Sequence, residues 1–352
     1  MIPHNRLTFD KKEETALIKI VRSGYWAAGK EVGKLEKSAV NIANRKYAVG
    51  VSSGLSAIRL SLIALGIKKN DEVIVPAYSC VALANAVLSC GAKPVPADVL
   101  PDDWNISPSS IGSKISPRTK AIIAVNTFGL PAKIEAIQKF KIPVIEDCAH
   151  GFGRVNKNLV LGKRGLISIS SFYATKLIGG GEGGIILTDK KNLAETAIDY
   201  RDYTDKKPSG LRLNEKMSNI DAAISMTQLK KLGSFVESRS KIAKYYSTEF
   251  AKIQKRFPPV IFPSYELRIW YRYVFYCREL KAELIIKELR THGVNASQPI
   301  ENWLTEKQIS KYPNAKFALN HLISLPIFPS LTVTERASVI NTVQKTLLKL
   351  LK

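Results

Sequence analysis

The chain has 352 residues, of which 45% are hydrophobic, and its 53 basic and 30 acidic side chains give a formal net charge of +23. This length and apolar content suffice for a substantial core in one or two domains. No run of eighteen apolar residues and no paired cysteine spacing occur, and the first residues lack the apolar core expected of a signal peptide. We therefore expect a cytoplasmic protein without a membrane span, a disulfide framework or a metal site.

Strand and helix patterns alternate up to about residue 235. We predict strands at 47–51, 72–75, 93–97, 121–125, 142–146, 166–172 and 184–188. Helices are predicted at 11–22, 31–43, 55–65, 79–89, 131–140, 191–199 and 217–231. Alternation of this kind is typical of an α/β fold with a mostly parallel sheet covered by helices.

The pattern changes after a helical stretch at 234–255, where Pro258, Pro259 and Pro263 interrupt it. A strand at 271–277, a helix at 281–291 and a last helix at 333–350 follow. We therefore predict two domains, a large α/β domain over residues 1–235 and a smaller C-terminal α/β domain over residues 236–352.

The first candidate site follows the strand at 47–51, where Ser52, Ser53 and Gly54 precede an apolar helix. Backbone N–H groups stay free at a helix N-terminus, and the helix dipole favours an anion there. Gly54 permits close approach of another segment or a positive φ. The turn suits a phosphate, although similar turns occur in α/β folds without one.

The second candidate site is the segment 142–153, in which four apolar residues lead to Glu146 and Asp147. Ligands collect at the carboxyl ends of strands in open α/β sheets. A carboxylate there can hold the pyridinium nitrogen of pyridoxal phosphate (PLP), or it can simply cap the next turn. His150 follows three residues later and is either structural or within reach of the ring hydroxyl.

The third candidate is Lys176, which follows the apolar run 166–172 and precedes the glycine-rich segment 179–184. A lysine held near flexible backbone can form a Schiff base and later carry a proton, although a lysine before glycines also occurs in ordinary loops. A phosphate turn, a ring carboxylate and a lysine in this order favour a PLP enzyme.

Longer motifs support this interpretation: SSGLSAI, VIEDCAHGFG, SFYATK with GEGG, LRLNEKMSNIDAAISMTQL and LPIFPSLT. With them, nearly the whole chain resembles the DegT/DnrJ/EryC1/StrS family of PLP-dependent sugar aminotransferases. The resemblance implies the aspartate-aminotransferase fold (fold type I), with a large PLP-binding domain, a mostly parallel sheet and a smaller C-terminal domain.

The resemblance also implies roles for single residues. Lys176 would form the Schiff base with PLP, Asp147 would hold the pyridinium nitrogen, and both are the expected catalytic residues. His150 would lie near the ring oxygen. The other expected cofactor contacts are the phosphate ligands Ser171, Gly54 and Leu55, the ring-face residue Cys80, and Asn214, which would reach the phosphate of the partner subunit in a homodimer.

Three positions depart from the family pattern. Leu55 replaces a phosphate-binding threonine, so either Ser53 or Ser56 compensates or only backbone donors act. Cys80 replaces an aromatic residue that stacks on the ring, and its soft sulfur can pack there without a stack. Lys216 replaces an arginine and lacks its bidentate geometry.

The implied activity is transfer of an amino group from L-glutamate to a nucleotide-linked keto sugar, in bacterial surface polysaccharide (lipopolysaccharide) or amino-sugar biosynthesis. A free acidic keto sugar is an alternative acceptor. A PLP-dependent sugar dehydratase is a second alternative, although relatives of that type replace the lysine by histidine. A non-catalytic nucleic-acid-binding regulator could use the positive charge, but no nucleic-acid-binding motif occurs, and we expect no such partner.

Substrate recognition is expected in three variable loops: around Tyr25 and Trp26, at 206–212, and at 297–303. Ser297 and Gln298 stand where the family often has a His-Tyr pair. The basic and aromatic cluster at 268–273 alternates in a way that predicts a strand with one polar face.

Overall fold

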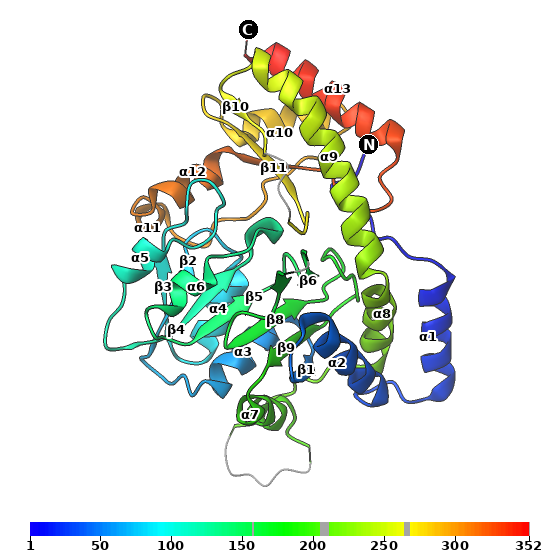
Figure 1. Ribbon diagram of the computed structural model, residues 1–352, viewed down its shortest axis with the longest axis vertical. Coiled ribbons are helices and arrows are strands. Elements are labelled where there is room, and N and C mark those ends of the chain that lie inside the picture. The colour runs from blue at the N-terminus through cyan, green and yellow to red at the C-terminus, as the bar shows by residue number, and fades with distance from the viewer. Residues whose placement is uncertain (157, 205–210, 264–267, 352) are drawn as a thin grey trace.

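The computed structural model describes residues 1–156, 158–204, 211–263 and 268–351. Its centre is a seven-stranded sheet in the order β1-β9-β8-β5-β4-β2-β3 (Figure 1). The strands span β1 (Tyr47–Val51), β2 (Glu72–Pro76), β3 (Lys93–Ala97), β4 (Thr119–Val125), β5 (Val144–Asp147), β8 (Ile167–Ser171) and β9 (Gly184–Thr188). Only β9 runs against its two neighbours, and the pairs from β8 to β3 are all parallel. The predicted mostly parallel sheet is confirmed.

Helices cover both faces of this sheet because side chains alternate across the strands. Val73 and Val75 pack towards a layer formed by α3 (Gly54–Ala64), α4 (Val81–Ser89) and α7 (Lys191–Arg201). Ile74, between them, packs on the opposite face. That face is covered by α2 (Lys30–Ala43), α5 (Pro108–Gly112), α6 (Ile134–Gln138) and α8 (Asn219–Lys230), with α1 (Lys11–Ser23) against α8.

The C-terminal part has a core of its own around the three-stranded antiparallel sheet β10-β11-β12. Its elements are α9 (Leu232–Arg256), β10 (Val260–Ile261), β11 (Tyr273–Cys277), α10 (Ala282–Thr291), α11 (Glu306–Ile309), α12 (Pro313–His321), β12 (Leu322–Leu325) and α13 (Val333–Leu350). Figure 1 shows α9 running from the large sheet to this part. The N-terminus joins it too, since Ile2 pairs with Val294. The boundary between residues 235 and 236 falls inside α9, and the two-domain division stays a prediction.

Most predicted elements are present with shifted ends, and several were missed. The strand predicted at 271–277 begins only at Tyr273. Helix α12 and strand β12 were not predicted, because His321 passes directly into Leu322 without a turn residue to separate a helix from an apolar strand. The short α5 and α11, the 3-10 turn η1 (Thr127–Gly129) and the hairpin of β6 (Gly153–Arg154) and β7 (Val160–Leu161) were also missed.

No helix in the part of the chain that the structure describes has the length and apolar character needed to cross a membrane.

Candidate active site

The carboxyl ends of β1, β5 and β8 meet at one edge of the large sheet, because these strands point the same way. A cavity of about 800 Å³ opens at this edge. The predicted site residues that line it are Gly54, Leu55, Cys80, Asp147, His150, Ser171 and Lys176. Asn214 is the one predicted site residue outside this lining.

At the predicted phosphate site, the start of α3 lies close to the end of β8. Helix α3 begins at Gly54, and the hydroxyl of its N-cap Ser53 accepts the N–H of Ser56 at 3.0 Å. The N–H groups of Gly54 and Leu55 belong to the first helical turn, which has no intrahelical acceptors for them. A Cβ at position 54 would lie 2.8 Å from Cβ of Ser171, so only glycine lets the strand end and the helix start form this cradle. The cradle fits a phosphate.

Asp147 ends β5, is 3% exposed and lines the cavity. Its Oδ1 accepts the N–H of Ala149 at 2.8 Å. Burial raises the pKa of Asp147, and neither that hydrogen bond nor the positive charge of Lys176 fully offsets it. A buried carboxylate in this position gains from a cationic partner, which a protonated pyridine nitrogen supplies.

Lys176 lies in the turn after β8, where its N–H donates to the carbonyl of Tyr173 at 2.8 Å. The side chain is half-buried, and Nζ lies 5.4 Å from the ring centroid of Tyr271. Its charge acts on Asp147 and on His150, lowering the pKa of each. Cradle, carboxylate and amine thus share one cavity, and this donor set fits PLP.

His150 stacks on Tyr271, with ring centroids 4.6 Å apart, and on Phe128 at 6.1 Å. Burial lowers the pKa of His150 well below its ordinary value, and the charges of Lys176 and Arg272 lower it further. The ring is therefore neutral at pH 7. Because Nδ1 lies 3.4 Å from the N–H of Phe128 and accepts from it, Nε2 carries the proton.

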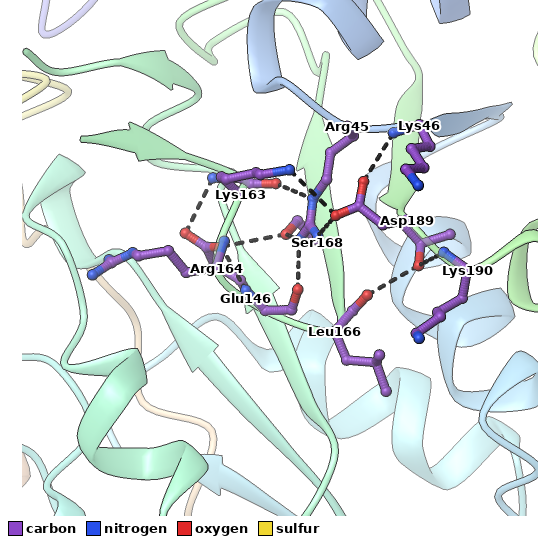
Figure 2. Close-up of polar contacts among 12 residues, drawn as sticks. Arg45, Lys46, Glu146, Lys163, Arg164, Leu166, Ser168, Asp189 and Lys190 are labelled. Atoms are coloured by element: carbon purple, nitrogen blue, oxygen red, sulfur yellow. Dashed lines mark hydrogen bonds and ion pairs between the residues drawn. The ribbon is translucent and has the colours of Figure 1, made fainter. Parts of the chain in front are cut away.

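Glu146 precedes Asp147 but turns away from the cavity into a buried polar network (Figure 2). Its carboxylate accepts the N–H groups of Gly162, Arg164 and Gly165 at 3.1, 2.9 and 3.0 Å. Burial opposes ionisation of Glu146, but these hydrogen bonds outweigh it and hold its pKa below the ordinary value. Arg45 donates from Nε to the carbonyl of Gly162 at 2.8 Å. The network anchors the segment before β8 to β5 and so supports the strand ends that present the site.

The departures from the family pattern have structural consequences. Ser53 lines the cavity, whereas Ser56 is buried and bonds to the Glu215 carboxylate. Of the two hydroxyls suggested as substitutes for the missing threonine, only that of Ser53 lies on the cavity. Cys80 is exposed just before α4 and lines the cavity without an aromatic ring.

Asn214 is exposed and forms an isolated bridge with Asp202. Nearby, Lys216 makes an ion pair of 2.6 Å with Asp202 and a bridge to Val51 at the end of β1. The segment thus lies beside the strand that leads into the cradle, but Asn214 does not turn into the cavity of its own chain.

Tyr271 and Arg272 are among the cavity residues that the sequence did not indicate. Tyr271 and Arg272 were assigned to a strand with one polar face, but the strand starts at Tyr273, and both residues line the cavity. Burial opposes ionisation of Tyr271, yet the charges of Lys176 and Arg272 outweigh it and lower its pKa. The cluster of arginine and aromatic residues at 268–273 was the sequence feature that could have indicated their place in the site.

The three expected recognition loops differ in position. Residues 297–302 line the cavity, while Trp303 packs into the core. Tyr25 and Trp26, 76% and 52% exposed, line a separate hollow beside Asn219. In the loop at 206–212, residues 206–210 lie outside the described residues. Among the described residues, no three His, Cys, Asp or Glu side chains cluster in a way that could hold a metal ion.

The model of the DegT/DnrJ/EryC1/StrS aminotransferase family matches residues 8–344, and the chain belongs to this family. Among solved structures it is similar to NtdA from Bacillus subtilis with bound cofactor PMP, at 27% identity over 96% of this chain and 82% of that chain, with a TM-score of 0.86. It is also similar to the aminotransferase from Psychrobacter cryohalolentis, at 25% identity over 99% and 100%, with a TM-score of 0.90.

A third similar structure is DesV from S. venezuelae in complex with a ketimine intermediate, at 25% identity over 97% of this chain and 98% of that chain, with a TM-score of 0.87. Family and fold together identify the class: the chain is a PLP-dependent aminotransferase of fold type I within a family of sugar aminotransferases. The family, the fold, the enzyme class and the cofactor predicted from the sequence are confirmed.

Proposed function

We propose that this enzyme transfers the amino group of L-glutamate to a nucleotide-linked keto sugar, in bacterial surface polysaccharide or amino-sugar biosynthesis. The observation that carries the proposal is the convergence of Lys176, the buried Asp147 and the Gly54–Ser171 cradle on one cavity. Residues 297–302 add hydroxyl, amide and carboxylate groups to the wall, which suits a sugar.

Lys176 and Asp147 perform the chemistry. When bound, PLP withdraws electrons from the substrate carbon that loses its proton. Asp147 keeps the ring nitrogen protonated and so maintains this withdrawal. The Lys176 amine would take the proton from the α carbon of the donor and deliver it to the C4′ carbon of the cofactor. In the second half of the reaction, the same amine moves a proton in the opposite sense for the keto sugar.

The remaining contacts orient the cofactor. The N–H groups of Gly54 and Leu55 and the hydroxyl of Ser171 would hold the phosphate. The Nε2–H of His150 would donate to the ring oxygen, a role that its neutral tautomer allows. Cys80 would pack against the ring face.

The active unit is a homodimer in the cytoplasm, in which Asn214 reaches the phosphate of the partner subunit. Two observations support the role of Asn214 at the partner subunit. Asn214 is exposed, and it lies beside the β1 end while staying outside the cavity of its own chain.

Replacement of Lys176 by alanine tests the assignment. The wild type is expected to retain PLP absorbance through gel filtration and to produce 2-oxoglutarate from L-glutamate, and Lys176→Ala is expected to lose both. Lys345→Ala, on the exposed side of α13, is the matched control and should retain both. Retention of turnover by Lys176→Ala refutes the proposed role.

A panel of keto sugars tests the acceptor. Enzyme carrying the aminated cofactor is mixed with nucleotide-linked or free keto sugars, and the products are identified by mass spectrometry. A product that has gained an amine supports transamination of that sugar, whereas a product that has lost an oxygen identifies a dehydratase.

A further inference from the structure

We propose that Arg272 forms a carboxylate-binding subsite in the active-site cavity, and that a substrate of this enzyme carries a carboxylate next to the reacting carbon. The inference rests on the proposed function and narrows its substrate class. Arg272 lies just before β11, in the C-terminal part, and lines the same cavity as Lys176.

One end of the guanidinium is held in place by the protein. Nη1 lies 3.1 Å from Nε2 of His4 and 3.5 Å from the hydroxyl oxygen of Ser324. The ring of Tyr271 lies 5.3 Å from the guanidinium carbon. These contacts fix the plane of the guanidinium, which is needed for directed recognition of a planar anion.

The other edge has no protein partner. Within the described part of the chain, no hydrogen bond engages Nε or Nη2 of Arg272, and Nε is buried without a partner. Nη2 is therefore the guanidinium nitrogen left to donate to an anion in the cavity, and a charged guanidinium donor makes strong hydrogen bonds with a carboxylate.

The charge of Arg272 also lacks a counter-ion. No carboxylate of the described residues lies within 4.0 Å of the guanidinium nitrogens of Arg272. Besides Asp147, the acidic residues that line the cavity are Glu182 and Glu301, and both are exposed. Its field reaches buried neighbours, because it contributes to the lowered pKa of His150 and of Tyr271. A half-buried cation without a partner gains from an anionic ligand.

The cofactor phosphate is not the anion expected at Arg272. The Gly54–Ser171 cradle is formed by α3 and β8 at the large sheet, whereas Arg272 lies just before β11 in the C-terminal part. A carboxylate can come from two sources, the amino donor or an acidic keto sugar. Both bind in turn at the same cavity, so one arginine can serve either.

His4 is the positioning residue for Arg272. Its backbone follows the pairing of Ile2 with Val294, and its Nε2 lies 2.9 Å from the hydroxyl of Ser324. Burial and the nearby charge of Arg272 lower the pKa of His4 to about 3. The ring is therefore neutral and accepts a hydrogen bond from the guanidinium instead of repelling it.

Calorimetric titration of the holoenzyme with glutarate, a dicarboxylate without an amine, measures the subsite apart from catalysis. We expect Arg272→Gln to weaken glutarate binding by about tenfold to 100-fold, and Arg272→Lys to weaken it less. Arg256→Gln removes the same charge from the exposed end of α9 and should bind like the wild type. Unchanged glutarate binding by Arg272→Gln, with the fold intact by circular dichroism, overturns the proposal.

Single-turnover reactions identify the source of the carboxylate. If Arg272→Gln slows only the half-reaction with L-glutamate, the carboxylate is that of the donor. If it slows only the reaction of an acidic keto sugar, and not of its neutral counterpart, the carboxylate is that of the acceptor. Equal rates for the variant and the wild type in both half-reactions contradict the subsite. A wild type that binds glutarate but transfers no amine refutes the proposed function and leaves the subsite standing.

Variants of His4 test positioning. His4→Ala should weaken glutarate binding by about tenfold, and His4→Gln, which keeps an acceptor, should restore part of it. Equal binding by His4→Ala and the wild type excludes a positioning role for His4.

Discussion

At Asp147, burial and neighbouring charge act in opposite directions. Burial raises its pKa, while the N–H of Ala149 and the charge of Lys176 favour the ionised form. A cation placed against this carboxylate satisfies it without a further protein partner. The buried carboxylate of Asp147 is therefore suited to bind the protonated pyridine nitrogen, as the proposed mechanism requires.

Asp147→Asn is expected to lower turnover by about 100-fold or more, because a neutral amide of the same shape no longer stabilises the protonated ring. PLP occupancy should fall far less, since the phosphate cradle and Lys176 remain. Single-turnover rates and cofactor content, measured on the same preparation, check this. An equal loss of both quantities would mean that Asp147 has only a structural role.

Individual site residues differ in how well the sequence predicts them. Gly54, Asp147 and Ser171 directly follow or end strands with clear apolar patterns, so their common edge could be predicted. Tyr271 and Arg272 reach the cavity from another part of the chain. Tertiary packing brings them there, and a local alternation of polar and aromatic residues cannot reveal it.

At the scale of elements, the N-terminus of α3 depends on how closely it approaches β8. The side chain of Ser171 occupies the space where a Cβ of residue 54 would lie. Any larger residue must push the helix start away from the strand end, and the free N–H groups move with it.

Gly54→Ala is therefore expected to weaken PLP binding by about tenfold, since overpacking of this kind costs about 1–3 kcal/mol. Gly33→Ala in α2 is the matched control, because nothing lies within 4 Å of the added Cβ. It should leave PLP affinity unchanged and stabilise the helix by about 0.5–1 kcal/mol. Cofactor titration followed by fluorescence measures the affinities, and an unaltered affinity in Gly54→Ala contradicts the cradle.

Elements whose apolar residues repeat with one clear period could be predicted from the sequence, and elements without such a period could not. The helix predicted at 333–350 matches α13, whose N-cap Thr332 and Glu335 form a capping box. The run Leu322–Leu325 is apolar except for Ser324 and carries no alternation, because every residue of β12 is buried. Such a run is compatible with a helix or a strand until its neighbours in space are known.

At the scale of the whole molecule, the proposed dimer makes each site depend on two chains. Lys176→Ala and Asn214→Ala subunits are each expected to be nearly inactive on their own. In mixed dimers, one site combines an intact Lys176 with an intact Asn214 of the partner subunit. Co-expression should therefore restore about a quarter of wild-type activity in a symmetric dimer. No recovery in purified mixed dimers contradicts the shared site.

The N-terminus links stability to pH through His4. Its pKa falls from 6.5 to about 3 on folding, so the unfolded chain binds a proton there that the folded chain does not. The contribution is complete above pH 6.5 and is lost as the pH falls towards 3. Between pH 6 and pH 4, the free energy of unfolding should fall more steeply in the wild type than in His4→Gln, by about 1.4 kcal/mol per pH unit. Urea denaturation measures both slopes, and parallel slopes contradict a buried neutral His4.

The central claim is that the amine of Lys176 binds the cofactor covalently. Reduction of the purified holoenzyme with borohydride, followed by proteolysis and mass spectrometry, locates the bond directly. The account predicts a single reduced phosphopyridoxyl group on the peptide that contains Lys176. A group on another lysine, or no modified peptide from a protein that carries PLP, would contradict it.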